Sequence, residues 1–423
     1  MKTKAFLLAA AGALAAATLT ACGSGSGSGG VSAPADPASV EGTVDMWVYP
    51  VINDKNQHTQ FWDKQIAAFQ AKYPKIKVKA EVFPWANRDT ALQTAIAARK
   101  GPDVAYLIPD QIPKYATSIA PVDDLLSPQV KESYLPNVRE SVTMNGHLMG
   151  VPVLVSANPL MCDKKAFAAI GNPPFPKTWD ELLALAPRFK EAGIYATNYY
   201  GGADASLNQS FYPVLWQAGG QVFGKDGRSV AFNDQSGVDA LTFVKKLADG
   251  GYVDKEQITT TPASLEQTAL AQNKVACTWQ NVPADVKSFW GKENIEILPP
   301  LSQKSPVGYG TVGTLSVLQG AKSKPAAALW LSWVAQPEVI KAYDVASGYY
   351  SPQKDSGGLY PDDPVQTAME KTVPTMTVGQ LNPKSRDVMG VLNPEIQAAL
   401  LGKKSPKQAL DDAAKVAATQ LGG

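Results

Sequence analysis

The first part of the sequence alternates strand and helix patterns, and this alternation fixes the fold class. Apolar residues occupy every second position over 44–48, as in a strand with one buried face. Residues 62–73 carry apolar side chains three and four positions apart, which predicts a helix. A second alternating run at 76–82, a helix at 90–98 and a strand at 104–108 follow. This order of elements predicts an α/β fold.

The same alternation recurs beyond residue 150, which indicates a second α/β unit. A strand is predicted at 151–155, and Thr178 with Glu181 has the spacing of a capping box that begins a helix. A chain of 423 residues is also too long for one compact core and suits two domains.

The amino terminus has the parts of a secretion signal. Two lysines precede an apolar run over 5–19, which is too short for a comfortable membrane span. The run ends in Leu-Thr-Ala-Cys22, which resembles a bacterial lipobox and implies cleavage before Cys22 and a lipid on its thiol. We therefore expect a signal peptide at 1–21, although an ordinary signal peptide with an incidental cysteine is the alternative. Residues 22–42 are rich in Gly, Ser, Ala and Pro and predict a lipid-anchored flexible linker.

Two further cysteines, Cys162 and Cys277, remain in the mature chain. In an oxidising compartment such a pair can form a disulfide, and the alternative is two buried free thiols. We predict that both cysteines lie on strands of the same lobe.

Charge and motif content argue against several classes of function. Basic and acidic residues number 39 and 38, so no basic excess favours nucleic acid. The two histidines, His58 and His147, lack metal-ligand spacing, and the sequence has no Gly-x-Ser-x-Gly motif. These features disfavour a His-based triad and a zinc site. Our expectation is a protein that is not an enzyme and that uses neither a metal nor a cofactor.

Several segments, in order along the mature chain, resemble family 1 extracellular solute-binding proteins, to which the maltose-binding proteins of ABC sugar importers belong. They are FWDKQIAAFQAKYPKIKVKAEV, GPDVAYLIPDQIPKYATSIAPVDDL, GHLMGVPVLVSANPLMCDKKAF, FPKTWDELLALAPRFKEAG, QNKVACTWQNVPADV and LLGKKSPKQALDDAAKVAATQL. Two departures occur in the fifth segment. Gln272-Asn273 replaces the family's usual Gly, and Cys277 replaces its usual Met.

The resemblance implies a periplasmic-binding-protein-like fold: two α/β lobes joined by a hinge of three chain crossings, with the ligand cleft between them. The crossings are expected near 155–158, 308–312 and 344–349. The amino-terminal lobe would then comprise 43–157 and 309–345, and the carboxy-terminal lobe 158–308 and 346–423. The implied protein is a monomer on the extracellular face of the cytoplasmic membrane. It captures a sugar or oligosaccharide by cleft closure and delivers it to the permease subunits of the transporter.

A sugar site needs flat aromatic faces together with amides and carboxylates that hold hydroxyl groups, and such groups lie after the strands of an α/β lobe. The resemblance adds an acidic-plus-polar pair, an aromatic platform and a cleft residue from the last segment. The candidates are Tyr49, Asn53, Asp54, Trp85, Asp110, Gln111, Ser156, Asn158, Asn208, Tyr212, Trp279, Asn281, Tyr309, Tyr349, Tyr350 and Arg386. Trp216, one helical turn beyond Tyr212, is expected to face the core.

Two other classes of function stay open. One is a binding protein for a polyamine, a polyol, a phosphate ester or a metal. The other is a secreted glycoside hydrolase, which would need two carboxylates at a set separation. A surface adhesin is disfavoured by the continuous two-lobe pattern.

The lipobox generates a prediction about the membrane anchor. Cys22→Ala should leave the binding domain folded but release it from the membrane or block its processing, because the acceptor thiol is lost. Membrane fractionation with immunodetection measures this, and Ser24→Ala in the same linker is the matched control. Equal membrane retention of Cys22→Ala and the parent would show that Cys22 is not the anchor.

Overall fold

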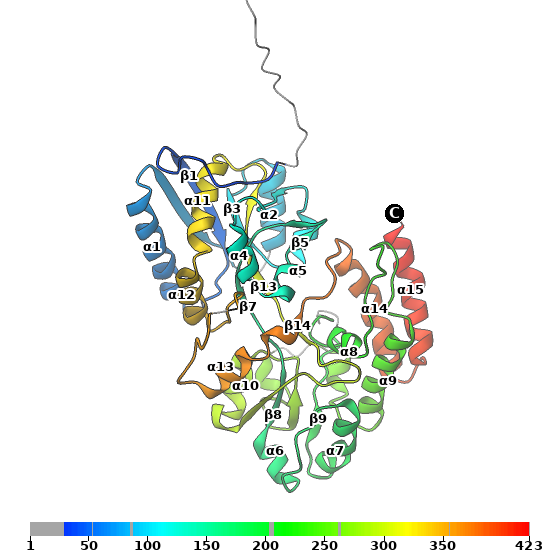
Figure 1. Cartoon of the computed structure of the whole chain (residues 1–423). Coiled ribbons are helices and arrows are strands. Elements are labelled where there is room, and N and C mark those ends of the chain that lie inside the picture. The colour runs from blue at the N-terminus through cyan, green and yellow to red at the C-terminus, as the bar shows by residue number, and fades with distance from the viewer. Residues whose placement is uncertain are drawn as a thin grey trace, which may run out of the picture.

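The computed structural model describes residues 29–52, 54–84, 88–202, 207–260, 264–354 and 356–422. These residues form two α/β lobes (Figure 1), the first around one hydrophobic core and the second around two. The predicted signal peptide at 1–21 and Cys22 lie outside the described residues. In the part of the chain that is described, no helix is both long and apolar enough to cross a membrane.

The amino-terminal lobe is built on a mixed sheet. β1 pairs in parallel with β2 and β3, and β13 pairs antiparallel with β3, β4 and β7. The carboxyl ends of the parallel strands therefore share one edge, where the first lobe meets the second. The strands are β1 (Gly42–Val48), β2 (Ile76–Val82), β3 (Val104–Leu107), β4 (Ile119–Ala120), β7 (Val151–Val155) and β13 (Val312–Leu318), with a small hairpin of β5 (Thr143–Met144) and β6 (His147–Leu148).

Helices cover this sheet through aromatic side chains. The first helix carries Trp62 and Phe69 on its buried face, and both rings contact Trp330 from a helix far along the chain. Because these rings remove large apolar areas from water, they join early and late segments into one core. The helices are α1 (Lys55–Lys72), α2 (Arg88–Ala97), α3 (Gln111–Lys114), α4 (Pro128–Ser133), α5 (Pro136–Glu140), α11 (Lys324–Val334) and α12 (Pro337–Ser347).

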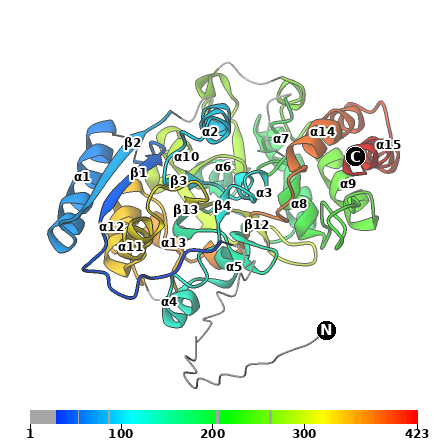
Figure 2. The same ribbon diagram turned by 90° about the horizontal axis from the view of Figure 1, so that it is seen from above.

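The carboxy-terminal lobe has a smaller sheet in the order β11-β8-β10-β9. The capping box predicted at Thr178 and Glu181 is confirmed, with both side chain to backbone hydrogen bonds in place. Figure 2 shows α9, α14 and α15 grouped at the end of the molecule opposite α1, α11 and α12. The elements are β8 (Leu160–Asp163), α6 (Lys164–Ala169), α7 (Trp179–Glu191), β9 (Tyr195–Thr197), α8 (Tyr212–Gln217), α9 (Gln235–Asp249), η1 (Glu256–Ile258), η2 (Leu265–Gln267), β10 (Val275–Thr278), α10 (Pro283–Trp290), η3 (Lys292–Asn294), β11 (Ile295–Leu298), α14 (Ser385–Leu400) and α15 (Pro406–Leu421).

Two of the chain crossings between the lobes lie near their expected places. The first joins β7 to β8, and the second joins β11 to β13 through β12 (Gly308–Tyr309). The backbone N–H of Asn158 donates to the carbonyl of Tyr309 at 2.9 Å, so the two crossings lie side by side.

The third crossing differs from the expectation at 344–349. Gly348 takes a left-handed conformation at the end of α12 (φ 74°) and turns the chain back. Tyr350 then exchanges backbone hydrogen bonds with Val155, at 2.8 and 3.0 Å. Core side chains from 350 to 376, including those of α13 (Pro364–Glu370) and η4 (Val373–Thr375), pack with the amino-terminal lobe. The chain enters the second lobe only after β14 (Met376–Thr377), which pairs in parallel with β12.

The segment before β1 is docked on the first lobe, in contrast to the flexible linker expected through residue 42. Val31 is only 2% exposed within the amino-terminal core, and its backbone N–H donates to the carbonyl of Pro121 at 2.7 Å. The Lys324 ammonium lies 3.4 Å from the carbonyl of Gly29. We call residues 29–41 the strap. Its buried anchor, Val31, lies in a stretch rich in Gly, Ala, Pro and Ser without an apolar period, so the sequence pattern did not indicate that it docks.

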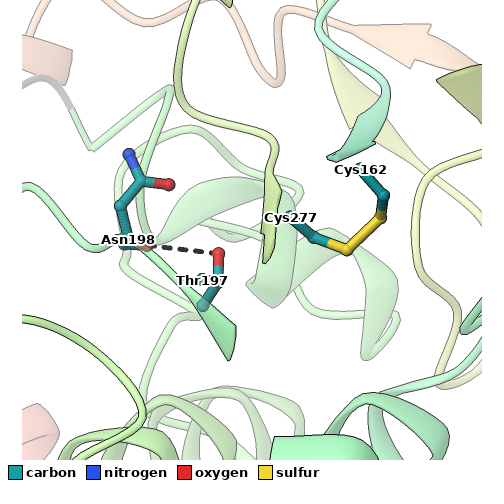
Figure 3. The surroundings of a disulfide bond; sticks show 4 residues. All are labelled: Cys162, Thr197, Asn198 and Cys277. Carbon is teal, nitrogen blue, oxygen red and sulfur yellow. Dashed lines mark hydrogen bonds between the residues drawn. A yellow bond between two sulfur atoms is a disulfide. The ribbon is translucent and has the colours of Figure 1, made fainter. Parts of the chain in front are cut away.

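The two cysteines are bridged within the second lobe. Cys162 of β8 and Cys277 of β10 are direct partners across the antiparallel pair, with Cα atoms 4.0 Å apart. Figure 3 shows the bridge near Thr197, the last residue of the neighbouring strand β9, and Asn198, which follows it. Both cysteines are fully buried, so the bridge ties the middle of this sheet.

The disulfide should contribute a large part of the stability of the second lobe. The Cys162→Ala/Cys277→Ala double variant is expected to lower the free energy of unfolding by about 3–5 kcal/mol, because the bridge closes a loop with a sequence separation of 115. Urea unfolding of the variant, compared with the oxidised parent, measures the loss. A free energy of unfolding equal to that of the parent would contradict this role.

Candidate functional site

A cavity of about 230 Å³ lies between the two lobes. Residues of both lobes and of the hinge contribute to its wall, so its shape depends on how the lobes are placed. The lining residues are Ile108, Pro109 and Asp110 from the first lobe; Tyr309, Thr311 and Val378, Gly379, Gln380 and Leu381 from the crossings; and Asn208, Gln209, Tyr212, Trp216, Val222, Phe223, Ser385, Arg386 and Met389 from the second lobe.

The first lobe presents Asp110 at the turn that follows β3. Asp110 precedes α3, but its carboxylate makes no capping hydrogen bond with that helix. The turn is held instead by its neighbour Gln111, whose side-chain oxygen accepts from Ile108 N–H at 3.1 Å and whose amide donates to Asp89 at 2.6 Å. The buried Gln111 thus supports the turn and leaves Asp110 free to face the second lobe.

The charges among the lining residues cancel. Asp110 and Arg386 are the charged side chains in this set, and they form an ion pair. Arg386 Nε donates to Asp110 Oδ2 at 3.1 Å, and Nη2 donates to the same oxygen. The remaining wall is aromatic, aliphatic or carries neutral hydroxyl and amide groups.

Three polar atoms of the wall are buried and have no hydrogen-bond partner among the described residues. They are Asp110 Oδ1, the Tyr212 hydroxyl and Trp216 Nε1. Burial raises the pKa of Tyr212 above its usual range, so its hydroxyl keeps the proton and remains able to donate. An unsatisfied buried polar group costs about 1–3 kcal/mol, so these atoms destabilise the protein in this arrangement.

Tyr212 and Trp216 reach the cavity because α8 places them one turn apart on the same face, with ring centroids 6.1 Å apart. Gly379 packs against the indole of Trp216, and a Cβ on this glycine would lie 2.6 Å from the ring. Gln380 holds the next part of the wall by exchanging two hydrogen bonds with the backbone of Phe223, at 2.8 and 2.9 Å.

Of the candidates from the sequence, the structure brings Asp110, Asn208, Tyr212, Tyr309 and Arg386 together in the cavity wall. Asn53 and Trp85 lie outside the described residues. The others are described but do not line the cavity, and their side chains cap helices, hold turns or pack in the cores.

Besides Gln111 of α3, two of these candidates lie in the first lobe, between β1 and α1. Asp54 caps α1, since its carboxylate accepts from Gln57 N–H at 2.8 Å. Tyr49 is buried in the core of the lobe, where its ring lies edge-on to that of Tyr106.

Three candidates hold the hinge and the edge of the second sheet. Ser156 accepts from the backbone N–H of Thr311 at 3.0 Å. The Asn158 amide donates to the carbonyl of Asn281 at 3.4 Å. The side-chain oxygen of Asn281 in turn accepts from Asn198 at 2.8 Å and from Thr278 at 3.0 Å.

Two tyrosines of the candidate set pack beside the third crossing. The Tyr350 hydroxyl donates to Gln366 at 2.6 Å, and the carbonyl of Tyr349 accepts from the Tyr360 hydroxyl at 2.5 Å. Burial raises the pKa of both Tyr349 and Tyr350.

The candidates from the sequence do not include the other lining residues, which are Ile108, Pro109, Gln209, Trp216, Val222, Phe223, Thr311, the stretch 378–381, Ser385 and Met389. Trp216 packs in the core of the second lobe as expected, yet one side of it also lines the cavity. Its spacing from Tyr212 was a usable signal for a shared face. The stretch 378–381 follows a two-residue strand, which has no readable period.

Trp279 gives a clear test of structural against binding roles. It is 5% exposed in the core of the second lobe, and its Nε1 donates to the carbonyl of Ser210 at 3.3 Å. Trp279→Ala should lower the free energy of unfolding by about 3–5 kcal/mol, because it leaves a large cavity. Denaturant unfolding measures this, and Trp279→Phe should lose less. Unchanged stability with weakened ligand binding would place Trp279 in the binding site instead.

Comparison with known proteins places the chain among transport proteins. The family model for bacterial extracellular solute-binding proteins matches residues 55–341, which is more than half of the chain. An uncharacterised ABC transporter extracellular-binding protein of Pyrococcus horikoshii is 26% identical over 323 residues, covering 73% of this chain and 72% of that protein. The maltotriose-binding protein of Pyrococcus abyssi is 24% identical over 305 residues, covering 70% and 64%.

Similarity to solved structures supports the fold. The cyclic α-maltosyl-1,6-maltose binding protein of Arthrobacter globiformis superposes with a TM-score of 0.78 at 20% sequence identity, covering 90% of this chain and 99% of that one. The periplasmic-binding-protein-like fold predicted from the sequence is thereby confirmed. Together with the match to the family model, this identifies the chain as a member of the bacterial extracellular solute-binding protein family.

Proposed function

We propose that this protein captures a neutral sugar or short oligosaccharide in the cavity between its lobes and delivers it to the permease subunits of an ABC importer. The observation that carries the proposal is the trio of unpartnered polar atoms on Asp110, Tyr212 and Trp216. Sugar hydroxyls both donate and accept hydrogen bonds, so one sugar can satisfy a carboxylate oxygen, a phenol and an indole N–H.

The aromatic side of the wall suits the same ligand. Tyr212, Trp216, Phe223 and Tyr309 all line the cavity. The apolar C–H faces of sugar rings pack against such flat surfaces, while the ring hydroxyls point to the polar groups. Relatives whose names include maltotriose and cyclic maltosyl-maltose favour this class of ligand.

The charge balance of the wall disfavours the other solutes. A polyamine would need several carboxylates, and the described wall has one, Asp110, already paired with Arg386. A phosphate ester would need more positive charge than this single neutralised arginine. A glycoside hydrolase needs two carboxylates across the scissile bond, and the described wall offers one.

Binding would work by cleft closure and needs no chemical step. A ligand that touches both lobes stabilises the arrangement in which they are close, and it shifts the equilibrium by its differential affinity. Asp110 lies in the first lobe, and Tyr212 and Trp216 lie in the second. The same contacts therefore bind the sugar and stabilise the arrangement in which the lobes are close.

The proposal includes where the protein works. A lipid on Cys22 would hold the monomer on the extracellular face of the cytoplasmic membrane, next to the permease. The signal pattern over 1–22 and the family membership support this location.

The Tyr212 hydroxyl separates binding from packing. Tyr212→Phe should raise the melting temperature of the ligand-free protein, because it removes an unsatisfied buried hydroxyl. It should also weaken maltotriose binding by about 1 kcal/mol, or about 5-fold, because one hydrogen bond to the sugar is lost. Isothermal titration calorimetry and thermal unfolding on the same sample measure both effects.

Tyr343→Phe is the matched control, since the Tyr343 hydroxyl is also buried and unpartnered but lies in the core of the first lobe. It should change stability in the same direction and leave affinity unchanged. Spermidine and glucose 1-phosphate complete the titrations. Tight binding of either one, with no response to maltotriose or other neutral sugars, would contradict the proposed ligand class.

A further inference from the structure

The Asp110–Arg386 ion pair joins the two lobes directly. Asp110 follows β3 of the first lobe, and Arg386 lies in the first turn of α14 in the second. Among the ion pairs of the described residues, it is the one whose partners both line the cavity. It is also separate from the backbone hydrogen bonds of the hinge, so lobe opening can break it without disturbing the crossings.

The position of Arg386 is unfavourable for the helix that carries it. The amino-terminal turn of a helix is the positive end of its dipole and favours acidic side chains. The charge of Arg386 is therefore not explained by α14. Its pairing with Asp110 offsets the unfavourable interaction with the helix dipole. Two donors of the guanidinium, Nε and Nη2, bind the same carboxylate oxygen, Oδ2.

The other carboxylate oxygen has no such partner. Asp110 Oδ1 is buried and unpartnered, and its carboxylate makes no bond to α3. Arg386 thus fixes the orientation of Asp110 while leaving Oδ1 for another donor. The side chain of Asp110 is 19% exposed and the side chain of Arg386 is 59% exposed, so solvent and salt can reach the pair.

We propose that Arg386 is a positioning residue that latches the lobes together through Asp110 before the solute arrives. This inference rests on the proposed function, because it assigns Oδ1 of the latched Asp110 to a hydroxyl of the sugar. The latch raises the fraction of protein in the binding-competent arrangement. The apparent dissociation constant varies inversely with that fraction, so loss of the latch weakens binding without removing any contact to the sugar.

The size of the effect follows from the exposure of the pair. Partly exposed ion pairs shift an equilibrium by about two- to five-fold and lose this effect in salt. Arg386→Gln keeps a polar side chain at the cleft but removes the charge. It should increase the open-to-closed ratio of the ligand-free protein by about two- to five-fold, and weaken maltotriose binding by at most the same factor.

The experiment compares lobe separation with affinity. Small-angle X-ray scattering of the ligand-free protein gives the radius of gyration, and calorimetry gives the affinity for maltotriose. Arg386→Gln should increase the ligand-free radius of gyration, and 0.5 M NaCl should do the same to the parent but add nothing to the variant. Lys384→Gln is the matched control, because Lys384 pairs with Asp387 beside it in sequence, on the same side of the cleft, at 3.5 Å. It should change neither quantity.

Two outcomes would overturn the latch. If Arg386→Gln leaves the ligand-free radius of gyration unchanged, the pair does not hold the lobes, whatever happens to the affinity. If it opens the lobes and maltotriose binding becomes tighter, the pair competes with the sugar instead of preparing its site. The scattering measurement needs no ligand, so it decides the latch even if the sugar proposal fails.

Discussion

The hydrogen-bonded ladder of the hinge is the interaction on which the rest of the structure depends. Asn158 bonds to Tyr309 at 2.9 Å, and Gly310 N–H bonds to the carbonyl of Thr377 at 3.1 Å, so three crossings lie side by side. The ladder sets the edges of two sheets against each other and thereby creates the cavity. Because these bonds join backbone groups, with Ser156 as an added side-chain acceptor, small changes of φ and ψ can tilt the lobes without exposing either core.

The sequence was sufficient for the fold and for part of the site. Hydrophobic periods identified β1, α1 and β2, since local spacing reports directly which face of an element is buried. Asp110 could be found because it follows a strand. The stretch 378–381 could not, because it reaches the cavity through contacts between segments distant in the chain, such as Gly379 against the indole of Trp216. The third crossing was misplaced for the same reason: the pairing of Tyr350 with Val155 has no local signal.

Unpartnered buried polar atoms are not confined to the cavity. Among the described residues of the second lobe, Tyr199, Trp290 and Asn393 also carry one. The atoms on Asp110, Tyr212 and Trp216 differ because they line a cavity that a ligand can enter. Proteins commonly accept some loss of stability of this kind at functional sites.

The strap has a geometric consequence for a membrane-bound form of the protein. Val31 is docked, and seven peptide steps separate Cys22 from Gly29, so the covalent chain lets Gly29 lie at most about 25 Å from Cys22. A lipid on Cys22 would then keep the first lobe within a thin shell above the bilayer. Within that shell the local concentration of the protein at a permease depends on the length of the chain between Cys22 and Gly29, because a shorter connection restricts the protein to a smaller volume.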